Sequence, residues 1–311
     1  MTPVIEFQGI WPGFLDSTDV CNRSFVEELL AGLRWPSGTR VVRFCSMFGK
    51  KKCPHWKPAD EVWISYSGEF EQWPDCGCFD LHLGGQEDGD RTVFLPLVVW
   101  YCHATGLWPR LVREGAPPAA KQFCCFVVTN PDGETRNRFY QRLQACYRPV
   151  QSYGRYRNNT GQFAPGTYWS EEYRMLLGRH KFALCFENNW DNRYITEKLV
   201  NAYAASCVPI YWGGASVCSW FNPSAFLSLP RAATEAQMDR LIEQIRLLDQ
   251  NPADFQRVWQ EPLFPGREPP RDMQLETVRR KIQSVLDRIP KRRRARVHLH
   301  PRLATACKRE R

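Results

Sequence analysis

The sequence KFALCFENNWDNRYITEKLVNAYAASCVPIYWG, residues 181–213, decides the fold class. It begins with an apolar strand pattern at 181–188, passes through a polar loop into a helical pattern at 195–206, and ends with a second apolar strand pattern at 207–213. This order is typical of a β-α-β unit, whose right-handed crossover makes the two strands parallel. In parallel sheets of this kind, ligands bind at the carboxyl ends of the strands.

The rest of the chain alternates in a similar way. Small residues and two prolines at 114–122 indicate a linker between two halves. We therefore predict an α/β fold with two Rossmann-like domains facing across a cleft, at residues 1–115 and 120–290, followed by a tail at 291–311. Further strands are predicted at 4–7, 39–48, 60–67, 78–84 and 122–131, and further helices at 24–33, 135–147, 170–180, 235–249 and 272–289.

The basic charge of the chain is concentrated in its tail. The net charge is +9, and residues 291–311, with nine Lys or Arg and one Glu, account for +8 of it. Proteins that bind nucleic acid more usually spread their basic residues over a face of the fold, so no nucleic-acid partner is expected. The tail is interpreted either as a contact for anionic lipid or another polyanion, or as a solvated charged end.

Hydropathy argues against a membrane-spanning segment. No apolar run reaches the roughly 18–20 residues of a membrane span, and the longest candidate, at 93–108, contains Pro and His. The first residues show no signal-peptide pattern. The expected location is therefore cytoplasmic, as a soluble or peripherally membrane-associated protein.

The 13 cysteines allow more than one interpretation. Several lie in strand-like runs such as FCCFVV and FALCF, where a reduced thiol is a small core residue, and reduced thiols are the default expectation. Two alternatives concern one loop region, where a zinc site or one disulfide could form, although the C-x7-C and C-x-C spacings fit no usual zinc pattern. The residues concerned are Cys45, Cys53, His55, Cys76 and Cys78.

The polar start of the 195–206 helix predicts a ligand site. Thr196 can cap the helix, whose N-terminal N–H groups and dipole favour an anion, and Lys198 adds a positive charge suited to a diphosphate. Glu197 can accept the two hydroxyls of a ribose, and Asn188 and Tyr194 can hold a base or a sugar. These residues together indicate a nucleotide-diphosphate or nucleotide-sugar site. The alternative is an ordinary capped helix with a surface Glu–Lys pair.

Three segments resemble the α1,3/4-fucosyltransferase family, which uses GDP-fucose. FALCFENNWDNRYITEKLVNAYAASCVPIYWGG, residues 182–214, resembles the family's donor-binding signature. FVVTNPDGETRNRFYQRL, residues 126–143, resembles the strand, loop and helix that precede it, and SYSGEFEQWPDCGCFD, residues 65–80, resembles a segment of the acceptor domain. The similarity extends over residues 60–225.

The resemblance implies a GT-B glycosyltransferase that inverts configuration, needs no metal or other cofactor, and transfers L-fucose from GDP-fucose to an acceptor glycan. The expected linkage is α1,3, to the 3-OH of a GlcNAc- or Glc-type sugar. The acceptor domain is the first and the donor domain the second. The resemblance implies Glu69 as the general base, and as donor-binding residues Arg136, Asn188, Tyr194, Glu197 and Lys198, with Arg157 as a further candidate.

The chain departs from the family pattern at two places. The donor loop contains the bulky Trp190, and Arg193 stands before the tyrosine, where Asp or a small residue is common. The sequence also lacks the membrane anchor of animal members, so it resembles the short soluble microbial or viral type. A Golgi location would follow only if the behaviour of eukaryotic members applied.

Three alternatives stay open. Asp88-Gly89-Asp90 could belong to a metal-dependent transferase of the other major fold, although its surroundings, GGQEDGDR, are typical of a loop. The chain could be a non-catalytic relative or a GT-B transferase that uses another GDP-sugar. It could also act as a polyanion or nucleic-acid binder through its basic tail.

Overall fold

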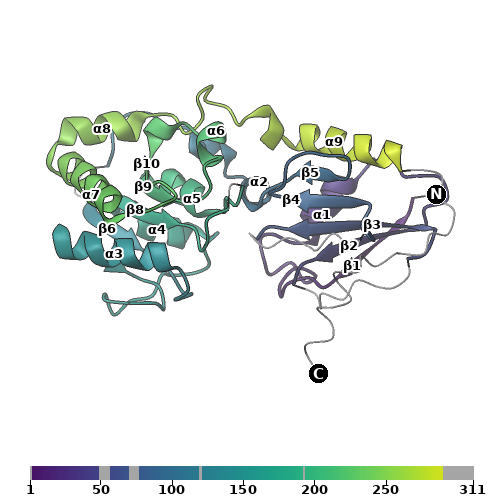
Figure 1. The fold of residues 1–311 in the computed structure, drawn as a ribbon, viewed down its shortest axis with the longest axis horizontal. Coiled ribbons are helices and arrows are strands. Elements are labelled where there is room, and N and C mark those ends of the chain that lie inside the picture. Colours follow the sequence, from purple (N-terminus) through teal and green to yellow (C-terminus); the bar gives the residue numbers. More distant parts are fainter. Residues whose placement is uncertain (1, 49–56, 70–76, 119–120, 192, 290–311) are drawn as a thin grey trace. The chain divides into compact units, whose positions relative to one another are not determined.

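The computed structural model describes residues 2–48, 57–69, 77–118, 121–191 and 193–289, which fall into two compact units (Figure 1). The first unit runs to Trp100 and resumes at Arg271, and the second spans Tyr101–Pro270. Helix α2 (Leu97–Ala104) contains the boundary between them.

The first unit is built on one parallel sheet with the strands in sequence order, β1-β2-β3-β4-β5. Helix α1 (Arg23–Leu30) connects β1 to β2, and helix α9 (Leu275–Arg288) packs against β4, β5 and α1. Figure 1 shows α9 running beside β5. The strands are β1 (Val4–Gln8), β2 (Val41–Ser46), β3 (Glu61–Ser67), β4 (Leu81–Gly84) and β5 (Thr92–Phe94).

Aromatic packing forms the core of the first unit. The ring of Trp100 is fully buried, stacks on Phe25 with centroids 4.6 Å apart, and meets Tyr66 edge-on at 4.7 Å. Phe44 and Phe14 contact the same ring. Since aromatic pairs of this geometry stabilise a core beyond their buried area, the cluster fixes α1 and α2 against β2 and β3.

The second unit has a parallel sheet in the order β10-β9-β8-β6-β7, which is not the sequence order. Its central strands, β6 and β8, are almost wholly buried, as expected for a parallel sheet covered on both faces. The strands are β6 (Gln122–Phe126), β7 (Gln151–Ser152), β8 (His180–Phe186), β9 (Val208–Trp212) and β10 (Leu227–Ser228).

Amphipathic helices cover this sheet. Helix α7 begins with a capping box between Thr234 and Gln237, and its buried stripe of Met238, Leu241 and Ile245 joins the core of the unit. The helices are α3 (Glu134–Cys146), α4 (Glu171–Gly178), α5 (Lys198–Ala204), α6 (Val217–Trp220), α7 (Glu235–Gln250) and α8 (Pro252–Gln260).

The division into units differs from the expected domain limits at both ends of the second domain. The units divide at Trp100 and Tyr101, within α2, and not in the linker predicted at 114–122. The helix predicted at 272–289 was assigned to the second domain, but α9 belongs to the first unit. Gln283 of α9 exchanges hydrogen bonds with the backbone of Arg34, at 2.8 and 3.0 Å, and Asp287 pairs with the Arg34 side chain at 3.2 Å. The basic tail at 291–311 lies outside the described residues. None of the described helices is both long and apolar enough to cross a lipid bilayer.

The expectation of reduced thiols is wrong at Cys78, which is disulfide-bonded. A cysteine in a disulfide offers no thiolate, so Cys78 is no zinc ligand. Cys45, another member of the suggested zinc set, is a free, buried thiol, and burial raises its pKa to about 12. The remaining members, Cys53, His55 and Cys76, lie outside the described residues.

Candidate functional site

The second sheet brings two loops together at its carboxyl edge. Neighbouring strands β6 and β8 lead into α3 and α5, but the chain continues from β6 to β7 on one side and from β8 to β9 on the other. Connections that leave in opposite directions create a switch point, which is where open α/β sheets bind their ligands. The loops beyond β6 and β8, together with the first turns of α3 and α5, carry five of the predicted site residues, Arg136, Asn188, Tyr194, Glu197 and Lys198.

Arg136 is a buried cation that has no carboxylate partner among the described residues. Its side chain is 1% exposed and folds over Gly133, where a Cβ atom would lie 2.8 Å from the guanidinium carbon. Nη1 donates a hydrogen bond to Asn188 Oδ1 at 2.6 Å and Nη2 donates to the Asn130 carbonyl at 2.7 Å, whereas the buried Nε has no hydrogen-bond partner in the part of the chain that the structure describes. Within the described part of the chain, no ion pair involves Arg136. Burial lowers the pKa of this guanidinium, and the nearby charge of Glu187 partly opposes the shift.

Lys198, the first residue of α5, is held from the buried side. Its Nζ donates hydrogen bonds to Glu187 Oε2 at 3.0 Å and to Thr196 Oγ1 at 2.8 Å, and Glu197 lies 3.7 Å away. Burial alone would lower the pKa of Lys198, but the carboxylates of Glu187 and Glu197 raise it overall. The ammonium is therefore charged at neutral pH.

The prediction that Thr196 caps the helix is wrong. Helix α5 begins at Lys198, its N-cap residue is Glu197, and no side chain caps it. Thr196 instead bonds to Glu187, through its backbone N–H at 2.8 Å and its hydroxyl at 2.8 Å. A buried carboxylate outside the helix has a greater need for hydrogen-bond donors than the helix end has for an acceptor.

The remaining donor-loop residues line the same edge. Asn188 is exposed and directs its Oδ1 to Arg136, Tyr194 is 5% exposed, and Glu197 is partly exposed. Tyr194 is close enough to both Arg136 and Lys198 to affect their electrostatics. Two cations, an accessible carboxylate and an amide at one edge can bind an anionic group and the hydroxyls attached to it.

Arg157 lies on a loop that runs past the end of β6. The loop is fixed by the Tyr156 N–H, which donates to the Val128 carbonyl at 3.0 Å, and by Gly154, where a Cβ atom would lie 1.9 Å from that carbonyl oxygen. Arg157 itself is exposed, with a left-handed φ of 51°, and its Nε donates to the Tyr156 hydroxyl at 2.9 Å. The structure thus places Arg157 at the carboxyl edge, on the solvent side.

The two residues of the donor loop that depart from the family pattern, Trp190 and Arg193, both have contacts within the second unit. Trp190 packs against the core of the unit, and the guanidinium of Arg231 lies 4.2 Å from the centre of its ring. The Arg193 N–H donates to Asp191 Oδ1 at 3.0 Å, and burial lowers the pKa of the Arg193 side chain. Asn192, between them, lies outside the described residues.

Glu69 belongs to the first unit, two residues beyond the carboxyl end of β3. It is partly buried, and its carbonyl accepts a hydrogen bond from Ser67 Oγ at 3.3 Å. Gly68 packs closely beside it, because a Cβ atom there would lie 2.8 Å from the Tyr66 hydroxyl and 3.3 Å from Leu97. The glycine of the Gly-Glu pair therefore has a steric reason, because a larger residue at position 68 would force the Tyr66 hydroxyl to shift.

The Asp88-Gly89-Asp90 segment has a structural role. Asp88 accepts a hydrogen bond from the Phe94 N–H at 2.8 Å and pairs with Lys281 of α9 at 2.7 Å. These contacts fix the loop before β5, which agrees with the loop pattern of the sequence. Among the described residues, no group of three or more His, Cys, Asp or Glu side chains is arranged to hold a metal ion.

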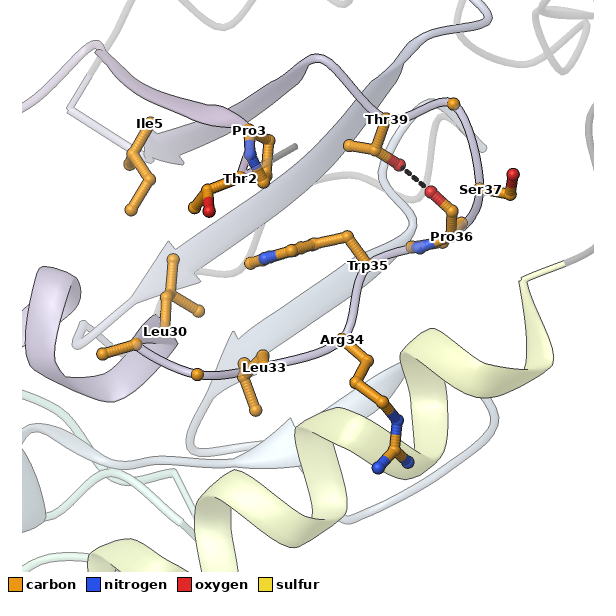
Figure 2. A pocket seen from close by; sticks show the side chains of 13 residues that line it. Thr2, Pro3, Ile5, Leu30, Leu33, Arg34, Trp35, Pro36, Ser37 and Thr39 are labelled. Carbon is orange, nitrogen blue, oxygen red and sulfur yellow. Dashed lines mark hydrogen bonds between the residues drawn. The ribbon is translucent and has the colours of Figure 1, made fainter.

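A cavity of about 680 Å³ in the first unit lies at the opposite end of its sheet, near the amino ends of β1 and β2 (Figure 2). Figure 2 shows the Trp35 ring extending into it between Thr2 and Leu30. The cavity contains none of the predicted site residues, so we assign it no part in the candidate site.

One site residue was missed by the sequence analysis. Glu187 is fully buried at the end of β8 and contacts both Thr196 and Lys198. Its signal was an acid placed directly after the apolar run FALCF, residues 182–186, where a charged side chain needs partners.

Residues 117–264 match the model of the glycosyltransferase family 10 (fucosyltransferase) C-terminal domain. The match covers just under half of the chain, and over these residues the chain is similar to glycosyltransferase family 10. The matched family 10 domain contains Arg136 and the whole β8–α5–β9 unit. An alpha-(1,3)-fucosyltransferase of Helicobacter pylori is 37% identical over 119 residues, which are 38% of this chain and 23% of that protein. A human 4-galactosyl-N-acetylglucosaminide 3-alpha-L-fucosyltransferase is 30% identical over 230 residues, 68% of this chain and 55% of that protein. The chain thus spans about a quarter to a half of these relatives' length.

Solved structures confirm the fold. A crystal structure of an alpha1,3-fucosyltransferase with GDP-fucose superimposes with a TM-score of 0.70 at 21% identity, covering 93% of this chain and 91% of that one. A complex of alpha1,3-fucosyltransferase with GDP gives 0.71 at 22% identity, covering 96% and 94%. The chain therefore has the GT-B fold of two Rossmann-like units, as the sequence predicted.

Proposed function

We propose that the chain is an inverting fucosyltransferase, which transfers L-fucose from GDP-fucose to a glycan hydroxyl and forms an α1,3 linkage. The observation that carries the proposal is Arg136, a buried guanidinium with no carboxylate partner within the described part of the chain. A buried charge is costly unless it is paired, and a bound diphosphate would supply the missing negative charge. The match to the family 10 domain, and relatives named as fucosyltransferases, support fucose as the transferred sugar.

In the proposed reaction, the second unit binds the donor. Arg136 and Lys198 hold the diphosphate, Glu197 accepts the ribose hydroxyls, and Asn188 and Tyr194 contact the nucleoside or the sugar. Arg157 is a further contact to the diphosphate from the solvent side. As the bond from the anomeric carbon to the diphosphate breaks, negative charge grows on the leaving oxygen. Two preplaced cations stabilise that charge more in the transition state than in the ground state.

Glu69 is proposed as the general base. Its carboxylate removes the proton from the acceptor hydroxyl while the oxygen attacks the anomeric carbon opposite the diphosphate, which inverts the configuration. Assistance by a positioned base is worth about 10²–10⁴-fold. Because Arg136 and Lys198 supply the positive charge that other transferases take from a divalent ion, we propose that the reaction proceeds without one.

The test combines the donor, an acceptor panel and one matched variant. The purified chain is incubated with GDP-fucose and a set of GlcNAc- and Glc-containing disaccharides, with and without EDTA, and the linkage is assigned by NMR. We expect α1,3-fucosylated product that survives EDTA, and loss of product with retained GDP binding in Glu69→Gln. A chain that neither binds GDP nor forms product with any acceptor would overturn the proposal, and transfer from another GDP-sugar alone would change the donor.

A further inference from the structure

Glu187 is a buried carboxylate whose two oxygens both face residues 196–198. Oε1 accepts hydrogen bonds from the Thr196 N–H at 2.8 Å and from the Thr196 hydroxyl at 3.1 Å, and Oε2 lies 2.8 Å from that hydroxyl and 3.0 Å from Lys198 Nζ. The opposite side is closed, because a Cβ atom on Gly213 would lie 2.9 Å from Glu187 Cγ. The carboxylate therefore has one available direction, toward the start of α5.

These contacts fix the geometry of the Lys198 ammonium. An ammonium has three donors, and two of them are used on the buried side, by Glu187 and by Thr196 Oγ1. Glu197, at 3.7 Å, is an ion-pair partner beyond hydrogen-bond distance. Since the three N–H bonds are tetrahedral, fixing two of them fixes the third, which has no hydrogen-bond acceptor among the described residues.

We propose that Glu187 is the positioning residue that orients Lys198 toward the diphosphate of the donor, with Thr196 as the bridge between them. This inference rests on the proposed function, because it concerns the same nucleotide site. A flexible lysine would lose side-chain entropy on binding a phosphate, whereas a lysine already held by Glu187 and Thr196 has lost it during folding. Glu187 acts only through Lys198 and touches no reacting atom.

If Glu187 only stabilised the fold, its loss would affect the binding of GDP and guanosine equally. A double-mutant cycle with Lys198 distinguishes this structural role from the positioning role. The variants are Glu187→Gln, Lys198→Met and the double variant, titrated with GDP and with guanosine, which lacks phosphates. We expect Glu187→Gln to weaken GDP binding about 10- to 100-fold, the range for a hydrogen bond to a charged group, and to leave guanosine binding unchanged. In the Lys198→Met background, Glu187→Gln should weaken GDP binding no further.

Asp249→Asn is the matched control. Asp249 is another buried carboxylate of the second unit and accepts hydrogen bonds from Lys181 and Tyr147, but it lies at the end of α7, next to the start of β8, away from the switch point. We expect it to lower the melting temperature without changing GDP affinity. Thr196→Val provides a second probe should Glu187→Gln fail to fold, because it removes the bridging hydroxyl and keeps both charges. It is expected to weaken GDP binding several-fold.

The outcomes separate the two proposals. Additive effects of Glu187→Gln and Lys198→Met, equal losses for GDP and guanosine, or wild-type GDP affinity in Glu187→Gln would overturn the positioning role and leave the proposed function intact. Absence of GDP binding by the wild-type chain would instead overturn the proposed function. In that case the same variants are compared by thermal unfolding. If Glu187 and Lys198 are coupled, Glu187→Gln should restore melting temperature that Lys198→Met has lost, because it removes the unpaired buried carboxylate.

Discussion

Replacing Arg136 with methionine is expected to weaken nucleotide binding strongly without destabilising the protein. The change removes two hydrogen bonds from a charged group, to Asn188 and to the Asn130 carbonyl, which together contribute about 3–6 kcal/mol. It also removes a buried Nε without a hydrogen-bond partner among the described residues, which costs about 1–3 kcal/mol, and a buried charge whose desolvation costs several kcal/mol. The sum predicts an unfolding free energy that is unchanged or slightly higher.

The same substitution is expected to weaken GDP binding, although it leaves the unfolding free energy unchanged or slightly higher. Loss of a buried cation that pairs with a diphosphate costs about 2–5 kcal/mol, so GDP affinity should fall by roughly 30-fold or more. Calorimetric titration with GDP and thermal unfolding of the same preparations provide both numbers, and Asp249→Asn serves as the control with the reverse pattern. If Arg136→Met lost more than about 2 kcal/mol of stability, the arginine would be a structural residue and the argument from its missing partner would fail.

Three further outcomes can be measured. Glu69→Gln should reduce transfer about 10²- to 10⁴-fold while GDP affinity stays within twofold, and near-normal turnover would remove Glu69 from the mechanism. Burial raises the pKa of Asp249, but hydrogen bonds from Lys181 and others lower it overall. The ionised carboxylate therefore stabilises the folded state fully above a pH of about 3.9, and this stabilisation is lost as the pH falls further. The unfolding free energy of Asp249→Asn should lack this pH dependence in an acid titration. Gly154→Ala should destabilise the chain by several kcal/mol, because its Cβ would overlap the Val128 carbonyl, and an unchanged melting temperature would contradict that packing.

Most of the second unit could be predicted from its sequence, because its central strands are apolar runs and its long helices have clear stripes. The strand predicted at 181–188 and the helix at 235–249 correspond to β8 and α7 within two residues. The placement of α9 could not be predicted, because its buried face of Val278, Ile282 and Val285 would fit either unit equally well. Contacts between residues far apart in the sequence decide it, such as those of Gln283 and Asp287 with Arg34, about 250 positions away, and of Lys281 with Asp88.

At the candidate site, the sequence indicated which residues gather but not how they pair. The charges of Glu197 and Lys198 suggested a nucleotide site, and the switch point between β6 and β8 brings them close to Arg136. Glu187 follows an apolar run, which signals a buried acid, but the sequence did not show that its partners are Thr196 and Lys198, nine and eleven residues later. Thr196 looked like a helix cap for the same reason, since its acceptor lies nine residues earlier in the chain.

The return of α9 to the first unit has a consequence for synthesis of the chain. The first sheet is complete once β5 has emerged, but the helix that packs on β4 and β5 comes only after the 170 residues of Tyr101–Pro270. At about 5–20 residues per second, the nascent first unit exposes that surface for on the order of 10–30 s. The second unit, being continuous, can fold during this interval, so it is the N-terminal unit, although made first, that is finished last.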